Sequence, residues 1–165
     1  MEEWRDFAAM AGGVIGVLLG LLFVAVSLRL DHLAASRPLR SRVAQVMTLL
    51  MGIFVAVLVV TLPNPATWVA GIEILAVGVA QALALVRLDR KVRKEPHVLD
   101  PTENMLKFTS HSLLTSVLVI GTGIGLVFGQ PAFLFALAAA VVTGLIGGIV
   151  SMWFVVLPPE KHPSE

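Results

Sequence analysis

Long apolar segments separated by short polar ones make up almost the whole chain. Five of these segments are long enough to cross a bilayer as helices, at about 1.5 Å of rise per residue against a hydrocarbon core of about 30 Å. We predict transmembrane helices at residues 7–30, 43–62, 66–86, 106–129 and 132–157. Pro63 and Pro65 end the second segment, and Gly129, Gln130 and Pro131 divide the last apolar region in two. The predicted fold is an all-α bundle, with residues 1–165 as one transmembrane domain.

The composition agrees with a polytopic membrane protein. Hydrophobic residues account for 57% of the 165 residues and charged residues for 14%, and the mean hydropathy is +0.90. The chain has no cysteine, which excludes disulfides, thiolate metal sites and a cysteine nucleophile. Glu2, Glu3 and Asp6 make the N-terminal stretch acidic, unlike the start of a secretory signal. We therefore expect the first helix to stay in the mature protein.

Lysine and arginine are distributed unevenly between the predicted loops. The loops after the first and third helices are basic, whereas the turns after the second and fourth contain neither residue. The basic positions are Arg29, Arg37, Arg40, Arg42, Arg87, Arg90, Lys91, Arg93, Lys94 and Lys107. Because basic loops stay in the cytoplasm, this pattern predicts an N-out/C-in, multi-pass protein of the cell inner membrane.

One basic cluster has two interpretations. Arg90, Lys91, Arg93 and Lys94 follow the third predicted helix directly. Beside a membrane they would attract anionic lipid headgroups, at about 1 kcal/mol per residue. The simpler interpretation is that these charges only set the topology. No aromatic residues are interleaved with them, so we do not expect nucleic-acid binding.

Small residues recur at every fourth position in several predicted helices, which aligns them along one ridge. They are Ala8, Gly12, Gly16 and Gly20 in the first helix, Gly121, Gly125 and Gly129 in the fourth, and Gly144 and Gly148 in the fifth. Such ridges allow close helix–helix packing in membranes. Because one bundle does not need them all, we predict contacts with further subunits, as a homo-oligomer or with a partner membrane subunit.

Glu73 is the only ionisable side chain deep within a predicted span. It lies about 10 Å inside the outer surface of the hydrocarbon core, judged by helical rise. A carboxylate facing lipid there costs about 2.5–3.5 kcal/mol, so we expect Glu73 to face protein or water. Two interpretations are open: a neutral, hydrogen-bonded structural group, or a carboxylate lining a path for protons or cations.

Few other polar side chains accompany it. Thr122 is the one side-chain hydrogen-bonding group near its level, and Gln81 is predicted to lie on the same helix face as Glu73, with Ala76 and Ala80 between them. Glu73, Gln81 and Thr122 therefore form the candidate ion or proton site. Further polar residues at the depth of Gln81 indicate either an inner polar ring or hydrogen bonds between helices. These are Ser27, Thr48, Thr115 or Ser116, and Ser151.

Catalytic chemistry is not indicated. No two of the four histidines are three or four residues apart, so no helical metal motif exists. One of them, His111, falls near the cytoplasmic end of the fourth predicted helix. The sequence has no Gly-x-Ser-x-Gly motif and no phosphate-binding glycine loop. We expect no enzyme activity, no cofactor and no metal.

The start of the chain carries a family resemblance. Trp4-x-x-Phe7, the pair Gly12-Gly13 and the stretch from Gly20 to Ser27 resemble small polytopic inner-membrane proteins of high-GC bacteria. The resemblance covers mainly the first predicted helix. It implies a bacterial inner-membrane protein and carries no activity with it.

The leading functional hypothesis from the sequence is a small, self-associating channel or transport unit in which Glu73 faces a polar path for protons or cations. The alternative is a non-conducting accessory or scaffold subunit of a larger membrane complex. Only alanine and valine line the helix between Glu73 and Gln81 on the predicted face, which is a gap in any continuous path.

Overall fold

The computed structural model describes residues 2–28, 37–62, 66–93 and 103–156, and the side chains of residues 4–28, 40–62, 66–90 and 111–150. Within these ranges the chain forms helices and no strand. The α-helices are α1 (Glu2–Leu28), α3 (Arg37–Thr61), α4 (Thr67–Arg93), α5 (Glu103–Val127) and α6 (Leu134–Val156), with the short 3-10 helix η1 (Pro131–Phe133) before α6. The predicted all-α fold is confirmed.

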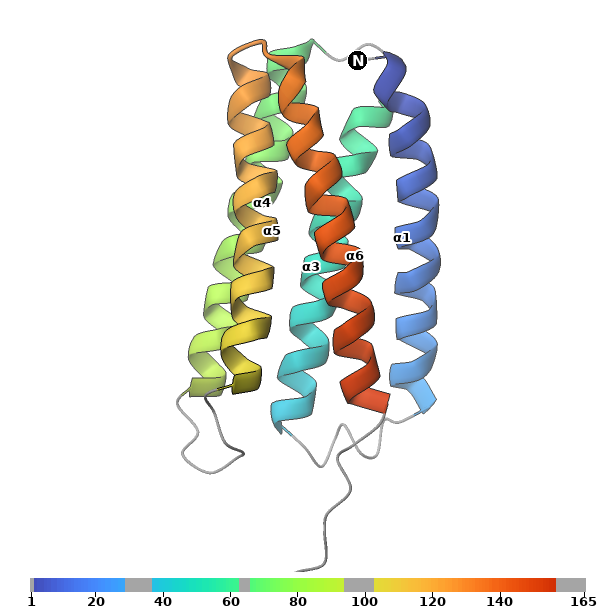
Figure 1. The fold of residues 1–165 in the computed structure, drawn as a ribbon, viewed down its shortest axis with the longest axis vertical. Helices are drawn as coiled ribbons and strands as arrows, with labels where there is room; N and C mark the ends of the chain where they lie inside the picture. The colour runs from blue at the N-terminus through green and yellow to red at the C-terminus, as the bar shows by residue number, and fades with distance from the viewer. Residues whose placement is uncertain (1, 29–36, 63–65, 94–102, 157–165) are drawn as a thin grey trace, which may run out of the picture.

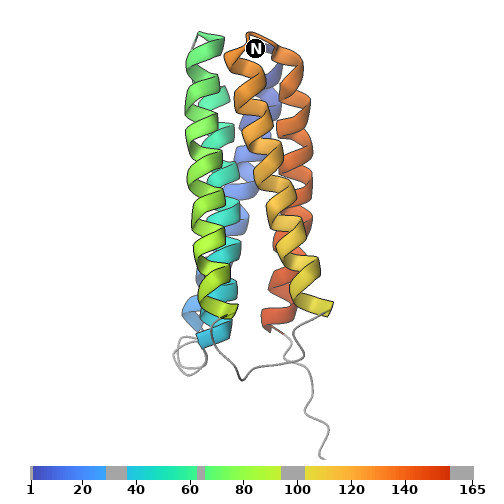
Figure 2. The ribbon, with the colours of Figure 1, turned by 90° about the vertical axis from the view of Figure 1, so that its left-hand side faces the viewer.

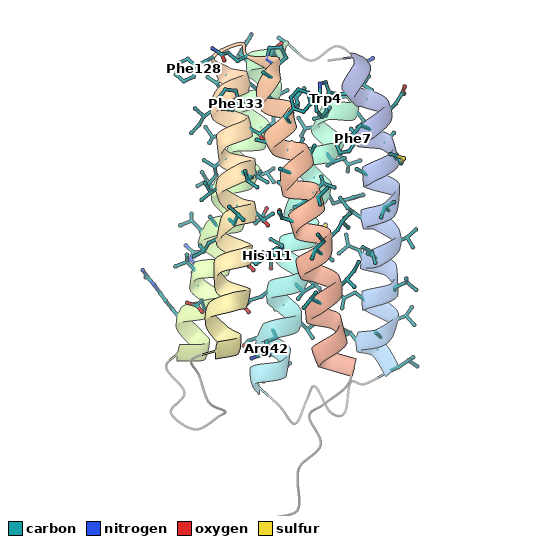
Figure 3. All side chains as sticks on the ribbon, in the orientation of Figure 1. Trp4, Phe7, Arg42, His111, Phe128 and Phe133 are labelled. Carbon is teal, nitrogen blue, oxygen red and sulfur yellow. The ribbon has the colours of Figure 1, made fainter. Side chains whose placement is uncertain are left out.

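The five α-helices lie along one common axis, and consecutive helices run in opposite directions (Figures 1 and 2). α3 and α6 occupy the middle of the bundle. α1 lies at one edge against α3, whereas α4 and α5 lie side by side at the opposite edge. We call the two ends of the bundle the Trp4 end and the Arg42 end, after residues labelled in Figure 3.

The turn between α5 and α6 shows how local sequence ends a helix. Gly129 has a φ of +73°, a conformation that glycine adopts without strain. Its N–H donates to the Leu126 carbonyl, and the Gln130 N–H donates to the Gly125 carbonyl, which together form a Schellman motif. Pro131 then starts η1. The predicted division at residues 129–131 is confirmed.

The core is organised around α3, which contacts every other α-helix. Its side chains Val46, Leu49, Leu50, Ile53 and Val57 are at most 2% exposed. At the Trp4 end, the ring of Trp4 lies edge-on to Phe135 of α6, with 4.8 Å between ring centroids. These contacts hold α1 against both central helices.

The outer surface of the bundle is apolar on every α-helix. Exposed large side chains include Val17 and Phe23 on α1, Met51 on α3, Leu83 on α4, Val117 on α5, and Phe135 and Ile146 on α6. Exposed apolar side chains in this number suit lipid rather than water. Four segments are long and apolar enough to cross a membrane, namely Trp4–Leu28, Arg40–Thr61, Thr67–Arg90 and Pro131–Val150, and α5 contributes a shorter apolar stretch, His111–Val127, within its described side chains. These features indicate a membrane protein.

Candidate functional site

Glu73 lies on the uncovered side of α4. The adjoining side of this helix, about 60–100° around the axis from Glu73, packs on α3 and α5 and includes the buried residues Ala70 and Ile74. Glu73 is exposed, as are Ala76 and Ala80. Among the described residues, none forms a hydrogen bond or ion pair with its carboxyl group. Of the two surroundings expected for Glu73, protein or water, a single chain therefore does not provide protein.

The prediction that Glu73 and Gln81 share one helix face is wrong. Gln81 is 4% exposed and lies against α3, whereas Glu73 is exposed. Eight positions along an α-helix correspond to a rotation of about 80°. On α4 that rotation separates the covered side from the uncovered one.

The interior of the bundle at the depth of Glu73 is apolar. Gly52 of α3 lies against Gln81 of α4, and the two helices are antiparallel, so Val60 is level with Glu73. The buried apolar side chains around this depth are Val60, Ala70, Ile74, Leu126 and Leu134, each at most 2% exposed, and Thr122 is the one buried polar side chain near it among the described residues. No polar path through the interior reaches Glu73 among these residues.

Thr122 is buried but belongs to a structural contact. Its Oγ1 lies 2.9 Å from the Leu118 carbonyl oxygen and 3.2 Å from the Phe133 carbonyl oxygen. The second contact connects α5 to η1 and helps to hold the turn after α5. The structure therefore does not bring the three residues of the candidate ion site together.

Gln81 stands out because neither its Oε1 nor its Nε2 has a hydrogen-bond partner within the described part of the chain, although both atoms are buried. Its side chain fills the space beside Gly52, where an added Cβ would overlap the amide group. The absence of a side chain at Gly52 is what allows Gln81 to pack between α3 and α4.

A cluster of polar side chains lies between α5 and α6, in the half of the bundle toward the Arg42 end. His111 Nε2 contacts the Thr143 carbonyl oxygen of α6, and Thr115 Oγ1 lies 3.0 Å from the His111 carbonyl oxygen and 3.3 Å from Thr143 Oγ1. His111 is partly buried and lies between α5 and α6 (Figure 3). Ser112 and Ser116 are also buried. We call His111, Ser112, Thr115, Ser116 and Thr143 the inner polar layer.

The inner polar layer corresponds in part to the predicted ring. Thr115 and Ser116 are both buried, as the ring requires, and Thr48 Oγ1 donates to the Ala44 carbonyl of its own helix. Ser27 is exposed and bonds only the Phe23 carbonyl among the described groups. The side chain of Ser151 lies outside the described residues.

The small residues of α1 divide between two sides of that helix. Ala8 is buried, an added Cβ at Gly12 would lie 3.6 Å from Val57 Cγ1, and one at Gly16 would lie 3.7 Å from Phe54 Cε2. These three residues face α3. Gly20, by contrast, has nothing within 4 Å of its Cβ position.

The ridges on α5 and α6 divide in the same way. Gly144 lies against Ile53, Gly148 against Leu50, and Gly125 against Phe133, whereas Gly121 faces open space and Gly129 belongs to the turn. The sequence pattern did not predict the closest approach between two helices, which is that of α4 and α5. At Gly71 an added Cβ would lie 2.5 Å from the Val127 backbone nitrogen, and at Gly123 it would lie 2.6 Å from that of Leu75.

Of the predicted headgroup cluster, Arg90 is exposed at the Arg42 end of α4. Lys91, Arg93 and Lys94 have side chains outside the described residues, so lipid binding there stays a prediction. No group of three potential metal ligands occurs in the described part of the chain.

Sequence reasoning missed two contacts made by charged or titratable side chains. One is His111 with the Thr143 carbonyl; Gly147 on α6, which leaves room for the ring, is a signal that was available. The other is Arg5, whose Nη2 donates to the Leu62 carbonyl at 3.1 Å. This bond connects α1 to the end of α3.

The fold and these residues define an all-α bundle with helices long and apolar enough to cross a membrane. Comparisons with protein-family models, curated protein sequences and solved structures find no match to this chain.

Proposed function

We propose that this chain is a five-span protein of the bacterial inner membrane, with its N-terminus outside and its C-terminus in the cytoplasm. Two observations support five spans rather than four. The helix α5 has 25 residues, and its axis is aligned with the axes of α4 and α6 in the bundle (Figure 2). Arg40 and Arg42 near the start of α3, and Arg87 and Arg90 near the end of α4, lie at the Arg42 end of the bundle. They support the orientation, because basic residues favour the cytoplasmic face.

Because the chain lacks cysteine, the orientation can be tested with single substitutions. Gln130 is exposed in the turn at the Trp4 end, and Arg90 is exposed at the other end. In cells that have lost the outer membrane but keep an intact inner membrane, a membrane-impermeant maleimide should label Gln130→Cys at once. It should label Arg90→Cys only after the inner membrane is permeabilised. The reverse order would overturn the proposed orientation.

In this membrane the protein acts as a self-associating, non-conducting scaffold subunit. The observation that carries this proposal is the position of Glu73 on an uncovered helix face, beside an interior that is apolar near the same depth apart from Thr122, whose hydroxyl bonds backbone carbonyls. A carboxyl group facing lipid is unfavourable, whereas a subunit contact would provide it with a partner. A path through one bundle would need polar groups at every depth, and this bundle has them mainly toward the Arg42 end.

A channel or transport unit for protons or cations is the second candidate. The inner polar layer favours it, because His111 and its hydroxyl neighbours provide exchangeable protons halfway across the bundle. A complete path would then have to leave the bundle and continue past Glu73 between subunits.

Flux through reconstituted protein separates the two functions. Liposomes containing the wild-type chain should show proton and potassium flux no higher than protein-free liposomes. Glu73→Gln should leave this flux unchanged. Circular dichroism of both proteins serves as the control for folding. Wild-type flux that is lost in Glu73→Gln would contradict the scaffold proposal and establish the transport function.

A further inference from the structure

We propose that copies of this chain associate head to tail, with α1 of one copy against α4 of the next and with Glu73 paired to Arg5 of the neighbouring copy. This inference rests on the proposed self-association and names the surfaces that make it. The occupant of each uncovered face is a second copy of the chain.

The two faces lie at opposite edges of the bundle (Figures 1 and 2). On α1 the exposed ridge runs through Ala9 and Gly13, and the half-buried Arg5 lies one turn before Ala9. An added Cβ at Gly13 would meet nothing within 4 Å. On α4 the exposed face carries Glu73 and Ala76. Small residues on both faces permit a close approach of the two helices.

The two faces also match in depth. Gly12 of α1 lies against Val57 of α3, which is five residues beyond Gly52. Gly52 lies against Gln81, and α3 and α4 are antiparallel, so Val57 is level with Ala76. Gly12 and its neighbour Gly13 therefore lie at the depth of Ala76. Since α1 and α4 run in the same direction, this register extends along both helices.

Charge complementarity selects the partner of Glu73. Arg5 is the only lysine or arginine at the Trp4 end among the described side chains. Its guanidinium reaches the Leu62 carbonyl, and Leu62 is two residues beyond Val60, which is level with Glu73. The guanidinium and the carboxylate thus differ in depth by about 3 Å. An arginine–carboxylate pair compensates a charge that lipid would leave unpaired.

Two other arrangements fit less well. A symmetric contact of α4 with α4 would bring two Glu73 carboxylates together, which is unfavourable for like charges. Lipid alone on this face would leave the carboxyl group without a partner. A head-to-tail contact avoids both problems, and because each copy has both faces, it generates either a ring or an open row of subunits.

Exchange of the two charges tests the pairing. Arg5→Glu and Glu73→Arg should each weaken self-association at least about tenfold, because each places like charges in contact. The double variant should restore it, and so should a mixture of the two single variants, in which each chain completes the other. Sedimentation in mild detergent measures the association, with helicity as the check on folding.

The matched control moves the cation without changing the net charge. Asp6 lies about 100° around α1 from Arg5, so Arg5→Glu combined with Asp6→Arg should not restore association. Since Glu73→Arg can fail to insert, Arg5→Gln and Glu73→Gln serve as milder variants and should also weaken association. Association of the wild type with no response to any of these variants would overturn the head-to-tail contact alone. A wild type that stays monomeric would overturn the proposed function as well.

Discussion

Two polar side chains of α4, which lie about two turns apart on the same helix, have very different surroundings. Gln81 is enclosed by protein and has no hydrogen-bond partner among the described residues. Glu73, about two turns away, is exposed. A buried polar group without a partner costs about 1–3 kcal/mol of stability.

Replacement of Gln81 by methionine should therefore stabilise the protein, by about 1–3 kcal/mol. Methionine has a similar length and volume and removes both unpaired atoms. The measurement is unfolding of the purified protein in detergent, followed by circular dichroism. Thr122→Val is the control, because it removes a hydroxyl that does have partners and should destabilise by about 0.6 kcal/mol. A loss of stability in Gln81→Met comparable to that of Thr122→Val would mean that the amide is paired.

Sequence identified the rare polar residues but not their surroundings. Both Glu73 and Gln81 are flanked by small apolar residues at helical spacing, so nothing local distinguishes the covered side of α4 from the uncovered one. The distinction is made by α3 and α5, which cover only part of the helix. A helix that is apolar all round carries little information about which side is buried.

Among the helices, α4 and α5 form the closest pair. Gly71 and Gly123 bring the two backbones together at the half of the bundle toward the Trp4 end, and Gly78 extends the contact against Ile120. Backbone atoms cannot rotate away from an added side chain. These glycines are therefore more constrained than the glycines that face flexible side chains.

We expect Gly123→Ala to destabilise the protein by about 1–3 kcal/mol, because its Cβ would overlap the backbone at Leu75 and force α4 and α5 apart. Gly121→Ala, two residues earlier on the same helix, should leave stability unchanged or slightly higher, since an added Cβ there meets nothing within 4 Å. Thermal unfolding of the two variants in one detergent makes the comparison. Equal stability of the two variants would contradict this packing.

The elements were more predictable than their contacts. The apolar segments and the Gly129–Pro131 break were sufficient to locate the helices and the turn before α6, because both depend on local composition. The spacing of Gly121, Gly125 and Gly129 at every fourth position did not identify Gly123, the glycine of α5 that packs against the backbone of α4. Which ridge becomes an interface depends on the neighbouring helix, and that information is not local.

At the scale of the whole molecule, the succession of up and down helices follows from the short polar connections in the sequence. The neighbour relations do not, since five helices of similar apolar composition can be arranged in several ways. The structure puts α1 and α4 at opposite edges, and each has an uncovered side. This arrangement is the basis of the proposed head-to-tail assembly.

Disulfide formation between single-cysteine variants tests that assembly most directly, because the natural chain contains no cysteine. Gly13→Cys and Ala76→Cys lie on the two proposed faces at matching depth. Neither variant alone should form a disulfide-linked dimer in oxidised membranes, whereas the two expressed together should form one. A dimer from either variant alone, or no dimer from the pair while the wild type associates, would contradict the account.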